Sequence, residues 1–221
     1  MEFYTEKKID YFSHPRMDLI SLIPKSANNK ILEIGAGGGD TLIEIKKQKL
    51  AQEVIGVELM QLPGTGQKDP SIDQWIYANI ENYDLPFEKE SFDVIICGDV
   101  FEHLLDPWRI VNKLTAFLKI GGSLVTSIPN IRIKNALYKI YVKGNFGYTS
   151  EGTFDKTHLR FFCKKNMMDM LTTENLQIVD IKRNFDLNPE NARTKLINNL
   201  TLNIFEEFLA LQYLFSVKRI S

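Results

Sequence analysis

Residues 30–40, KILEIGAGGGD, decide the fold of this chain. The apolar run 30–34 enters a cluster of glycines, and residues 40–49 follow with apolar side chains at helical spacing. Glycines at such a junction let the backbone turn sharply and approach a ligand, because no Cβ stands in the way. The helix that follows presents free N–H groups and the positive end of its dipole. We therefore expect a buried strand, a ligand-binding turn, and a helix with Asp40 at its N-cap.

Strand-like and helix-like segments alternate along the rest of the chain. The expected strands are 30–34, 53–58, 74–77, 92–98, 123–128, 176–183 and 212–220. The expected helices are 15–24, 40–49, 107–118, 133–142, 164–174 and 193–210. Pro107 is expected to open its helix and Gly121-Gly122 to close it, while 60–72 and 144–160 are expected to be loops. This alternation is typical of a doubly wound α/β sheet.

Composition and charge exclude several classes of protein. With 221 residues, 44% hydrophobic and 25% charged, the chain is ordinary globular protein. The net charge of −1 argues against a general nucleic-acid binder. No apolar stretch reaches the roughly 20 residues of a membrane span, and no secretory signal is visible. Two cysteines are too few for a disulfide framework, so we expect a cytoplasmic protein.

Acidic side chains refine the meaning of the glycine turn. Asp40 stands where the dinucleotide fingerprint G-x-G-x-x-G has its third glycine. Glu33 precedes the first glycine by two residues and can accept hydrogen bonds from the loop or from a ligand ammonium group. Glu58 ends the second strand, 23 residues after Gly35, where an acid can accept both hydroxyls of a ribose. A plain tight turn and a solvated strand-end charge are the alternatives.

Five segments in this order resemble class I S-adenosylmethionine-dependent methyltransferases. Glu33-x-Gly35-x-Gly37-x-Gly39 is similar to motif I of that family. The later segments are 78–93, 98–108 (GDVFEHLLDPW), 118–122 and 155–162 (DKTHLRFF). The last of them resembles the group found in bacterial surface-glycan and sugar gene contexts. The chain departs from the family at 60–70, where Pro63, Gly64 and Gly66 oppose the helix that usually follows the second strand.

The resemblance covers about residues 10–220 and implies a fold and a cofactor. The fold is α/β: a Rossmann-like, doubly wound, seven-stranded and mostly parallel sheet, with the last strand antiparallel and helices on both faces. Residues 1–221 would form a single methyltransferase domain, with an N-terminal helical segment 1–29 and a lid or substrate-side insertion 130–162. The cofactor would be S-adenosyl-L-methionine, and the product S-adenosyl-L-homocysteine. Its binding residues would be Glu33, Gly35, Ala36, Gly37, Glu58, Leu59, Asn79, Ile80, Gly98, Asp99, Tyr11 and Arg16.

The acceptor side is predicted from few candidates. The catalytic candidates are His103, His158 and Asp99, and the substrate-binding candidates are Arg160, His158 and Tyr148; no metal ligand set is predicted. A histidine could remove the proton of an acceptor hydroxyl, and the planar fork of an arginine suits a phosphate or carboxylate.

Each of these acceptor-side candidates also has a structural reading. His103 could cap the following helix or pack against Trp108, and His158 could order its own loop. Arg160 could pair with Asp155 or another nearby acid. The aromatic side chains of 146–162 could form a platform for a sugar or, more readily, a small core of the loop. The remaining histidine, His14, is expected at the surface.

The sequence therefore predicts methyl transfer to a small-molecule acceptor, such as a hydroxyl of a sugar or glycan precursor. One alternative is a non-catalytic S-adenosylmethionine-binding or scaffold protein of the same fold. A nicotinamide oxidoreductase and an RNA methyltransferase are further alternatives, opposed by Asp40 and by the near-neutral charge respectively. No nucleic-acid partner and no membrane span are expected. A homodimer is left open, because residues 205–215 could pack in the core or against a second subunit.

Overall fold

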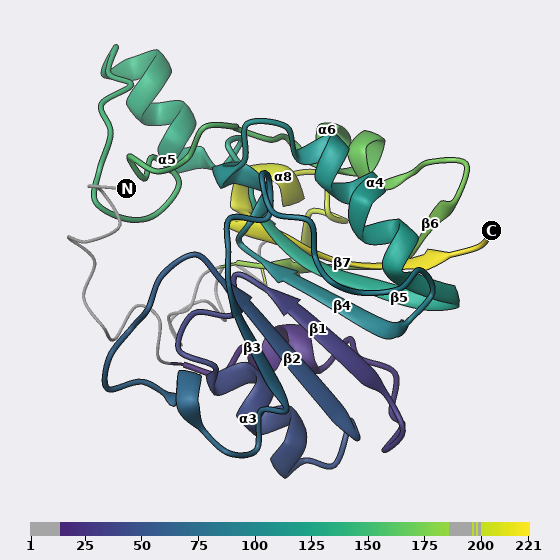
Figure 1. Cartoon of the computed structure of the whole chain (residues 1–221). Coiled ribbons are helices and arrows are strands. Elements are labelled where there is room, and N and C mark those ends of the chain that lie inside the picture. The colour runs from purple at the N-terminus through teal and green to yellow at the C-terminus, as the bar shows by residue number, and fades with distance from the viewer. Residues whose placement is uncertain (1–13, 186–195, 197, 199) are drawn as a thin grey trace.

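A seven-stranded sheet forms the centre of the protein in a computed structural model that describes residues 14–185, 196, 198 and 200–221 (Figure 1). The strands are β1 Lys30–Ile34, β2 Glu53–Glu58, β3 Gln74–Tyr77, β4 Phe92–Gly98, β5 Leu118–Pro129, β6 Leu176–Asn184 and β7 Gln212–Arg219. Their order is β3-β2-β1-β4-β5-β7-β6. Strands β1 to β5 pair in parallel, and β7 is antiparallel to both of its neighbours. The predicted fold class, including the antiparallel last strand, is confirmed.

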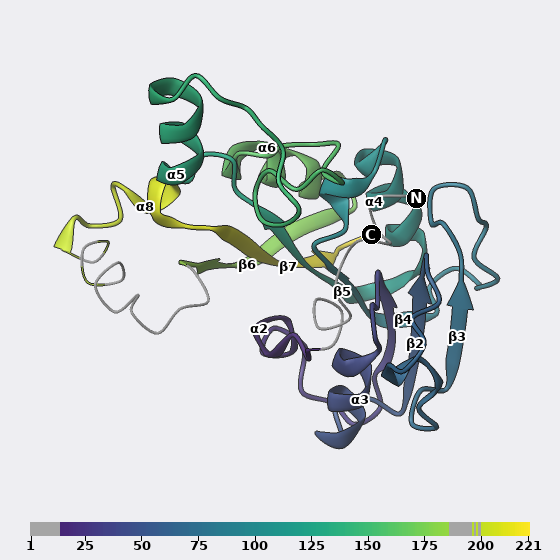
Figure 2. The same ribbon diagram turned by 90° about the vertical axis from the view of Figure 1, so that its left-hand side faces the viewer.

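Helices cover both faces of this sheet. They are α2 Met17–Ile20, α3 Asp40–Lys47, α4 Pro107–Phe117, α5 Lys134–Leu137, α6 Lys164–Leu171 and α8 Glu206–Leu209. Two short 3-10 helices, η2 Gly66–Lys68 and η3 Phe101–His103, and a π-helix, η4 Tyr138–Val142, complete them. Figure 2 shows α2 and α3 on one side of the sheet and α4 and α6 on the other.

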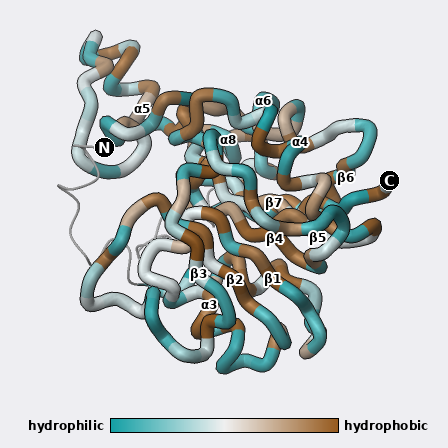
Figure 3. The backbone as a smooth tube through the Cα atoms, viewed as in Figure 1, coloured by the Kyte–Doolittle hydropathy of each residue, from teal (hydrophilic) through white to brown (hydrophobic). Residues whose placement is uncertain are grey.

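The core follows from the alternation of side chains along each strand. In β1, Leu32 and Ile34 belong to the buried cluster under α4 and α6, whereas Ile31 belongs to the cluster under α2 and α3. Strand β4 repeats the pattern. The buried side chains of both clusters are at most 9% exposed. Figure 3 shows the resulting concentration of hydrophobic residues in the central strands. A sheet covered on both faces needs apolar side chains at nearly every position, and this explains the continuous apolar runs of the sequence.

Several predicted boundaries were wrong. Helix α4 ends at Phe117, and Gly121-Gly122 lie inside β5, because Leu118 already pairs with Phe92 of β4. Helix α3 has Gly39 as its N-cap, so Asp40 is the first helical residue and caps nothing. Only Met17–Ile20 of the predicted helix 15–24 is an α-helix. Of the predicted helix 193–210, Leu196, Asn198, Leu200 and Glu206–Leu209 are helical and 201–205 form a turn, while 193–195, 197 and 199 lie outside the described residues.

Residues 130–162 form an excursion from the end of β5, and the two ends of this segment lie side by side. Asn130 and Phe162 form an isolated parallel bridge, and the backbone N–H of Ile131 donates to the carbonyl of Phe162 at 3.0 Å. Between these ends the chain forms α5, η4 and a long loop that projects from the body of the molecule (Figure 1). The predicted loop 144–160 is confirmed. Within the part of the chain that the structure describes, no helix combines the length and apolar character needed to cross a membrane.

Candidate functional site

The turn between β1 and α3 is built from glycines with left-handed backbone angles. Gly35, Gly37 and Gly39 have φ values of +69°, +53° and +90°. A Cβ on Gly35 would stand 2.7 Å from Cγ2 of Val100, so a side chain at this position would force Val100 to shift. Because β1 lies between β2 and β4, the turn lies at the centre of the sheet's carboxyl edge. Ligands of open α/β sheets bind at this edge.

Glu58 at the end of β2 holds this turn in place. Its Oε2 accepts a hydrogen bond from the backbone N–H of Gly37 at 2.9 Å, and its Oε1 accepts from Leu59 at 2.7 Å and Met60 at 3.2 Å. Burial raises the pKa of Glu58, although these backbone donors lower it. The carboxylate of Glu58 thus borders the glycine turn. The neighbouring loop 60–72, predicted from its prolines and glycines, contains only the short helix η2.

Gln67 organises that loop, a role that was not predicted from the sequence. Its side chain is buried, and its Nε2 donates to the carbonyls of Gly37 at 2.8 Å and Met60 at 3.0 Å. Its Oε1 accepts from the backbone N–H of Leu62 and from the hydroxyl of Tyr77. One glutamine therefore ties the loop to the glycine turn and to β3. No local pattern marks a glutamine in a loop for this role.

Glu33 at the end of β1 is a buried acid. It is 4% exposed, and its Oε2 has no hydrogen-bond partner among the described residues. Burial, opposed by Arg16 and a hydrogen bond with Thr41 and assisted by the charge of Glu58, raises the pKa of Glu33 to about 8. A buried polar atom without a partner is costly. Glu33 is therefore suited to accept a hydrogen bond from a ligand at the glycine turn.

Arg16 and Asp99 form an ion pair beyond the ends of β4 and β5. Nη1 of Arg16 lies 2.5 Å from Oδ2 of Asp99, and Nη2 donates to Ser127 at 3.1 Å and Gln212 at 3.2 Å. Burial lowers the pKa of Arg16, but Asp99 and the neighbouring Asp18 raise it more. Ser127 and Gln212 also donate to Oδ1 of Asp99. With its carboxylate so engaged, Asp99 is better placed to orient groups at the site than to remove a proton.

Gly98 completes this corner. A Cβ there would lie 2.7 Å from Leu19 and 3.4 Å from Nη1 of Arg16, so β4 approaches the N-terminal segment closely. The predicted adenine-side residues lie next to β3: Ile80 is buried, whereas Asn79 is exposed and its Oδ1 accepts from the backbone N–H of Glu81 at 2.9 Å. An adenine contact through that oxygen would have to use its second lone pair.

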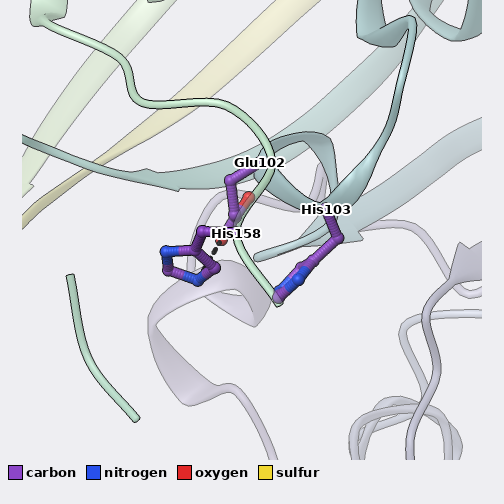
Figure 4. Close-up of side chains that lie close together, drawn as sticks. All are labelled: Glu102, His103 and His158. Carbon is purple, nitrogen blue, oxygen red and sulfur yellow. Dashed lines mark ion pairs between the residues drawn. The ribbon is translucent and has the colours of Figure 1, made fainter. Parts of the chain in front are cut away.

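The two histidines predicted on the acceptor side do come together. The rings of His103 and His158 have centroids 4.8 Å apart, and Nε2 of His158 lies 4.0 Å from Oε1 of Glu102 (Figure 4). Glu102 is 1% exposed and His158 7%, and the sequence analysis gave Glu102 no role. Its position beside His103, just after a buried strand, is the signal that was available. The cap of α4 is Asp106, which accepts from Arg109, so His103 does not cap that helix.

The other acceptor-side candidates are Arg160, Tyr148 and the aromatic side chains of the loop. Arg160 donates from Nη2 to the carbonyl of Leu105, and its buried Nε has no hydrogen-bond partner in the described part of the chain. Tyr148 is 54% exposed. Phe146 contacts Phe154 edge-on at 5.0 Å. Phe154 belongs to a small separate core, Phe161 packs against it and Phe162 is buried in the main core, so most loop aromatics are packing residues.

Two predictions concern the N-terminal segment. Tyr11 lies outside the described residues. His14 is exposed, as expected.

Relatives of the chain can now be compared with this geometry. A ubiquinone biosynthesis O-methyltransferase of Vibrio parahaemolyticus is 28% identical over 182 residues, which are 79% of this chain and 74% of that protein. The enzyme of the same name from Coxiella burnetii is 28% identical over 172 residues, or 71% and 70% of the two chains. An S-adenosylmethionine dependent methyltransferase of Mesorhizobium loti has a similar structure, with a TM-score of 0.65 at 17% identity over 92% of this chain and 96% of that one.

The family itself is shown by a sequence model described as "Methyltransferase domain", which matches residues 7–181. The match contains β1 to β5, the glycine turn, Glu58, Asp99 and both histidines of the acceptor side. The fold of the Mesorhizobium loti protein agrees with it. This chain therefore belongs to the methyltransferase domain family.

Proposed function

We propose that the carboxyl ends of β1, β2 and β4 bind S-adenosylmethionine and present its methyl group to a hydroxyl of a small-molecule acceptor. The observation that carries this proposal is the meeting of Glu33, Glu58 and the Arg16–Asp99 pair around the glycine turn. The unpartnered, buried Oε2 of Glu33 suits a ligand that brings its own hydrogen-bond donor. Residues of this kind fit an amino-acid-like moiety next to a ribose.

Each residue has a distinct part in this proposal. Gly35, Ala36 and Gly37 let the backbone pass under the methionine portion, and Glu33 accepts from its ammonium group. Glu58, followed by Leu59, accepts from the ribose hydroxyls with the lone pairs that its backbone donors leave. These assignments agree with those expected from the sequence.

The remaining cofactor-side residues line the edges of the site. Asn79 and Ile80 border the adenine, and Gly98 and Asp99 lie near the methionine portion. Arg16 acts by holding Asp99 in position. For Tyr11, the predicted contact with the cofactor remains a proposal.

The bound cofactor supplies a methyl group already activated on a sulfonium, so the protein has mainly to position an acceptor. An acceptor hydroxyl must also lose its proton, and His103 and His158 are the histidines close to the strand-four exit. Oxygen as the accepting atom is supported by the relatives, whose names specify O-methyl transfer. The insertion 130–162, with Tyr148 and Arg160, would cover the acceptor as a lid.

Calorimetric titration of the purified protein with S-adenosylmethionine, S-adenosylhomocysteine and NAD tests the cofactor part. We expect binding of both adenosyl ligands and none of NAD. Acceptor screening then compares nucleotide sugars with phenolic hydroxyl compounds, and transfer is followed with donor labelled in the methyl group. Binding of NAD alone, or methylation of nitrogen or carbon only, would contradict the proposal.

Variants of the two histidines test the acceptor part. We expect that His103→Gln or His158→Gln abolishes turnover while the affinity for S-adenosylhomocysteine changes little, because in this proposal Glu33, Glu58 and the glycine turn hold the cofactor. If both variants remain fully active, the acceptor is positioned without a histidine. A sugar or glycan precursor as the acceptor stays a prediction, since the relatives named above are enzymes of ubiquinone biosynthesis. A homodimer and a cytoplasmic location also stay predictions.

A further inference from the structure

Glu102, His103 and His158 bring three metal-binding groups together from two distant segments. Glu102 and His103 lie on η3, directly after β4, while His158 lies in the insertion (Figure 4). One ligand atom from each residue lies within 4.8 Å of those of the other two. Glu102 and His158 are almost completely buried, so the group is set into the protein and is not a cluster of surface charges.

The hydrogen bonds of the two rings determine which nitrogen faces the group. Nδ1 of His103 lies 3.0 Å from the carbonyl oxygen of Thr157, and Nδ1 of His158 lies 3.2 Å from that of Thr153. A carbonyl only accepts, so each neutral ring must carry its proton on Nδ1 and its lone pair on Nε2. Histidines that bind metals are oriented in this way, with the other ring N–H donated to a backbone carbonyl or carboxylate.

The backbone holds the two segments in register. The carbonyl of Glu102 accepts from the N–H groups of Leu159 at 2.8 Å and Arg160 at 3.0 Å. Oδ1 of the buried Asp155 accepts from the backbone and the hydroxyl of Thr157, the residue whose carbonyl orients His103. The two rings and the backbone of Glu102 are therefore positioned by bonds that do not depend on a ligand, as a prepared site requires.

From this arrangement we propose that Glu102, His103 and His158 bind a divalent transition-metal ion, for which Zn²⁺ is the best match. Two imidazoles and one carboxylate are the protein ligands of a catalytic zinc site, in which a further position stays open for water or substrate. Mg²⁺ and Ca²⁺ prefer oxygen ligands throughout. The buried carboxylate favours a dication for a second reason, because a positive charge offsets the cost of keeping an ionised group away from water.

Binding requires a small closure of the site. Ligand bonds of about 2.0–2.1 Å in a tetrahedral site place the ligand atoms about 3.4 Å apart. Nε2 of His158 and Oε1 of Glu102 are at 4.0 Å, so these side chains would approach one another by less than an ångström. His103 is only partly buried, which leaves its ring room to rotate toward the other two.

The site is also adjacent to the proposed cofactor pocket. The backbone N–H of His103 donates to the carbonyl of Val100, and Val100 packs over Gly35 of the glycine turn. At this position an acceptor hydroxyl bound to the ion would lose its proton to solvent more readily. Its oxygen would then form the bond to the methyl carbon while the carbon–sulfur bond pair returns to sulfur. This role rests on the proposed function, whereas binding of the ion does not.

Metal titration of the chelator-treated, tag-free protein tests the site. We expect one equivalent of Zn²⁺ by calorimetry, and one equivalent of Co²⁺ with the visible absorption of a low-symmetry site. Glu102→Gln and His103→Gln should each weaken binding by at least about 10-fold, since loss even of an orienting partner has that effect. His14→Gln, at an exposed histidine, and Cys163→Ser should bind as the parent does.

The outcomes separate the metal site from its role in the reaction. Circular dichroism identifies any variant that fails to fold, and if Glu102→Gln does not fold, His103→Gln decides. Absence of stoichiometric binding, or binding unchanged in the folded variants, overturns the site. Turnover that survives chelation overturns the role of the ion. The affinity for S-adenosylhomocysteine is measured on the same chelated samples. If these samples do not bind S-adenosylhomocysteine, the proposed cofactor site fails, whatever the result of the metal titration.

Discussion

Two glutamates at neighbouring strand ends show how surroundings decide the role of a residue. Glu33 and Glu58 both end a strand next to the glycine turn, and burial raises the pKa of each. Backbone N–H groups of the turn donate to Glu58, which stabilises its ionised form. The carboxylate of Glu33 lacks such backbone donors among the described contacts and has one oxygen without a partner. Glu58 is therefore a fixed acceptor, whereas Glu33 is able to change its protonation with ligand and pH.

Replacement of Glu58 tests the ribose side. We expect Glu58→Gln to raise the Kd for S-adenosylhomocysteine at least about 10-fold, because a hydrogen bond to a charged acceptor contributes about 1.5–3 kcal/mol. The amide would also place an N–H group against the backbone donors of the turn. Calorimetric titration measures the affinity, and Glu53→Gln, at the other end of β2, serves as the control. An unchanged Kd with a folded variant would refute the assignment.

The stability of the protein should depend on pH through Glu33. In the unfolded chain this carboxyl ionises near its ordinary pKa of 4.5, whereas in the fold its pKa is about 8. Between these values the unfolded state binds fewer protons. The free energy of unfolding therefore falls as pH rises, by at most about 1.4 kcal/mol per pH unit, and levels off above the folded pKa. Urea unfolding across this range should show the fall in the parent and in Glu53→Gln, and lose most of it in Glu33→Gln; an equal slope in all three would contradict the prediction.

The turn between β1 and α3 depends on conformations that other residues rarely adopt. We expect Gly35→Ala to lower the free energy of unfolding by about 1–3 kcal/mol and to weaken cofactor binding, because φ is +69° and the new Cβ would meet Val100 at 2.7 Å. Gly64→Ala is a matched control, since φ is +83° there but no atom lies within 4 Å of the added Cβ. Urea unfolding of both variants separates backbone strain from steric contact. Equal losses would mean that Val100 yields without cost.

At the scale of the whole molecule, Arg16 joins the N-terminal segment to three strands. Its guanidinium donates to groups after β4, in β5 and in β7, so one side chain connects parts of the chain up to 196 residues apart. We expect Arg16→Met to lower the free energy of unfolding by about 2 kcal/mol, because it leaves Asp99 without its ion pair. Lys119→Met removes a more exposed pair with Asp93 and should cost less than about 1 kcal/mol.

Thermal and urea unfolding of the two variants provide the comparison. A loss for Arg16→Met no larger than that for Lys119→Met would mean that the N-terminal segment is held by apolar packing alone. In that case Leu19 and Ile20 of α2, both buried in the second core cluster, would supply its attachment.

Local patterns determined the elements and the glycine turn at the carboxyl edge of the sheet. Apolar runs, glycine positions and acids at strand ends are properties of short stretches, so β1 to β7, the glycine turn and the positions of Glu33 and Glu58 could be read from the sequence. The boundaries that failed did so for tertiary reasons. Gly121-Gly122 continue β5 because β4 offers a partner, although on their own they would end a helix.

The sequence by itself thus determined the fold class and placed Glu33, the glycine turn and Glu58 at neighbouring strand ends. Only the tertiary structure decided the strand order, the anchoring of the loop by Gln67, the engagement of Asp99 by Arg16, and the meeting of Glu102 with His158 across 56 residues. The reason is physical. The period of a strand or helix is encoded within a few residues, whereas a contact between distant polar side chains depends on how the whole sheet packs and on which groups are left buried together.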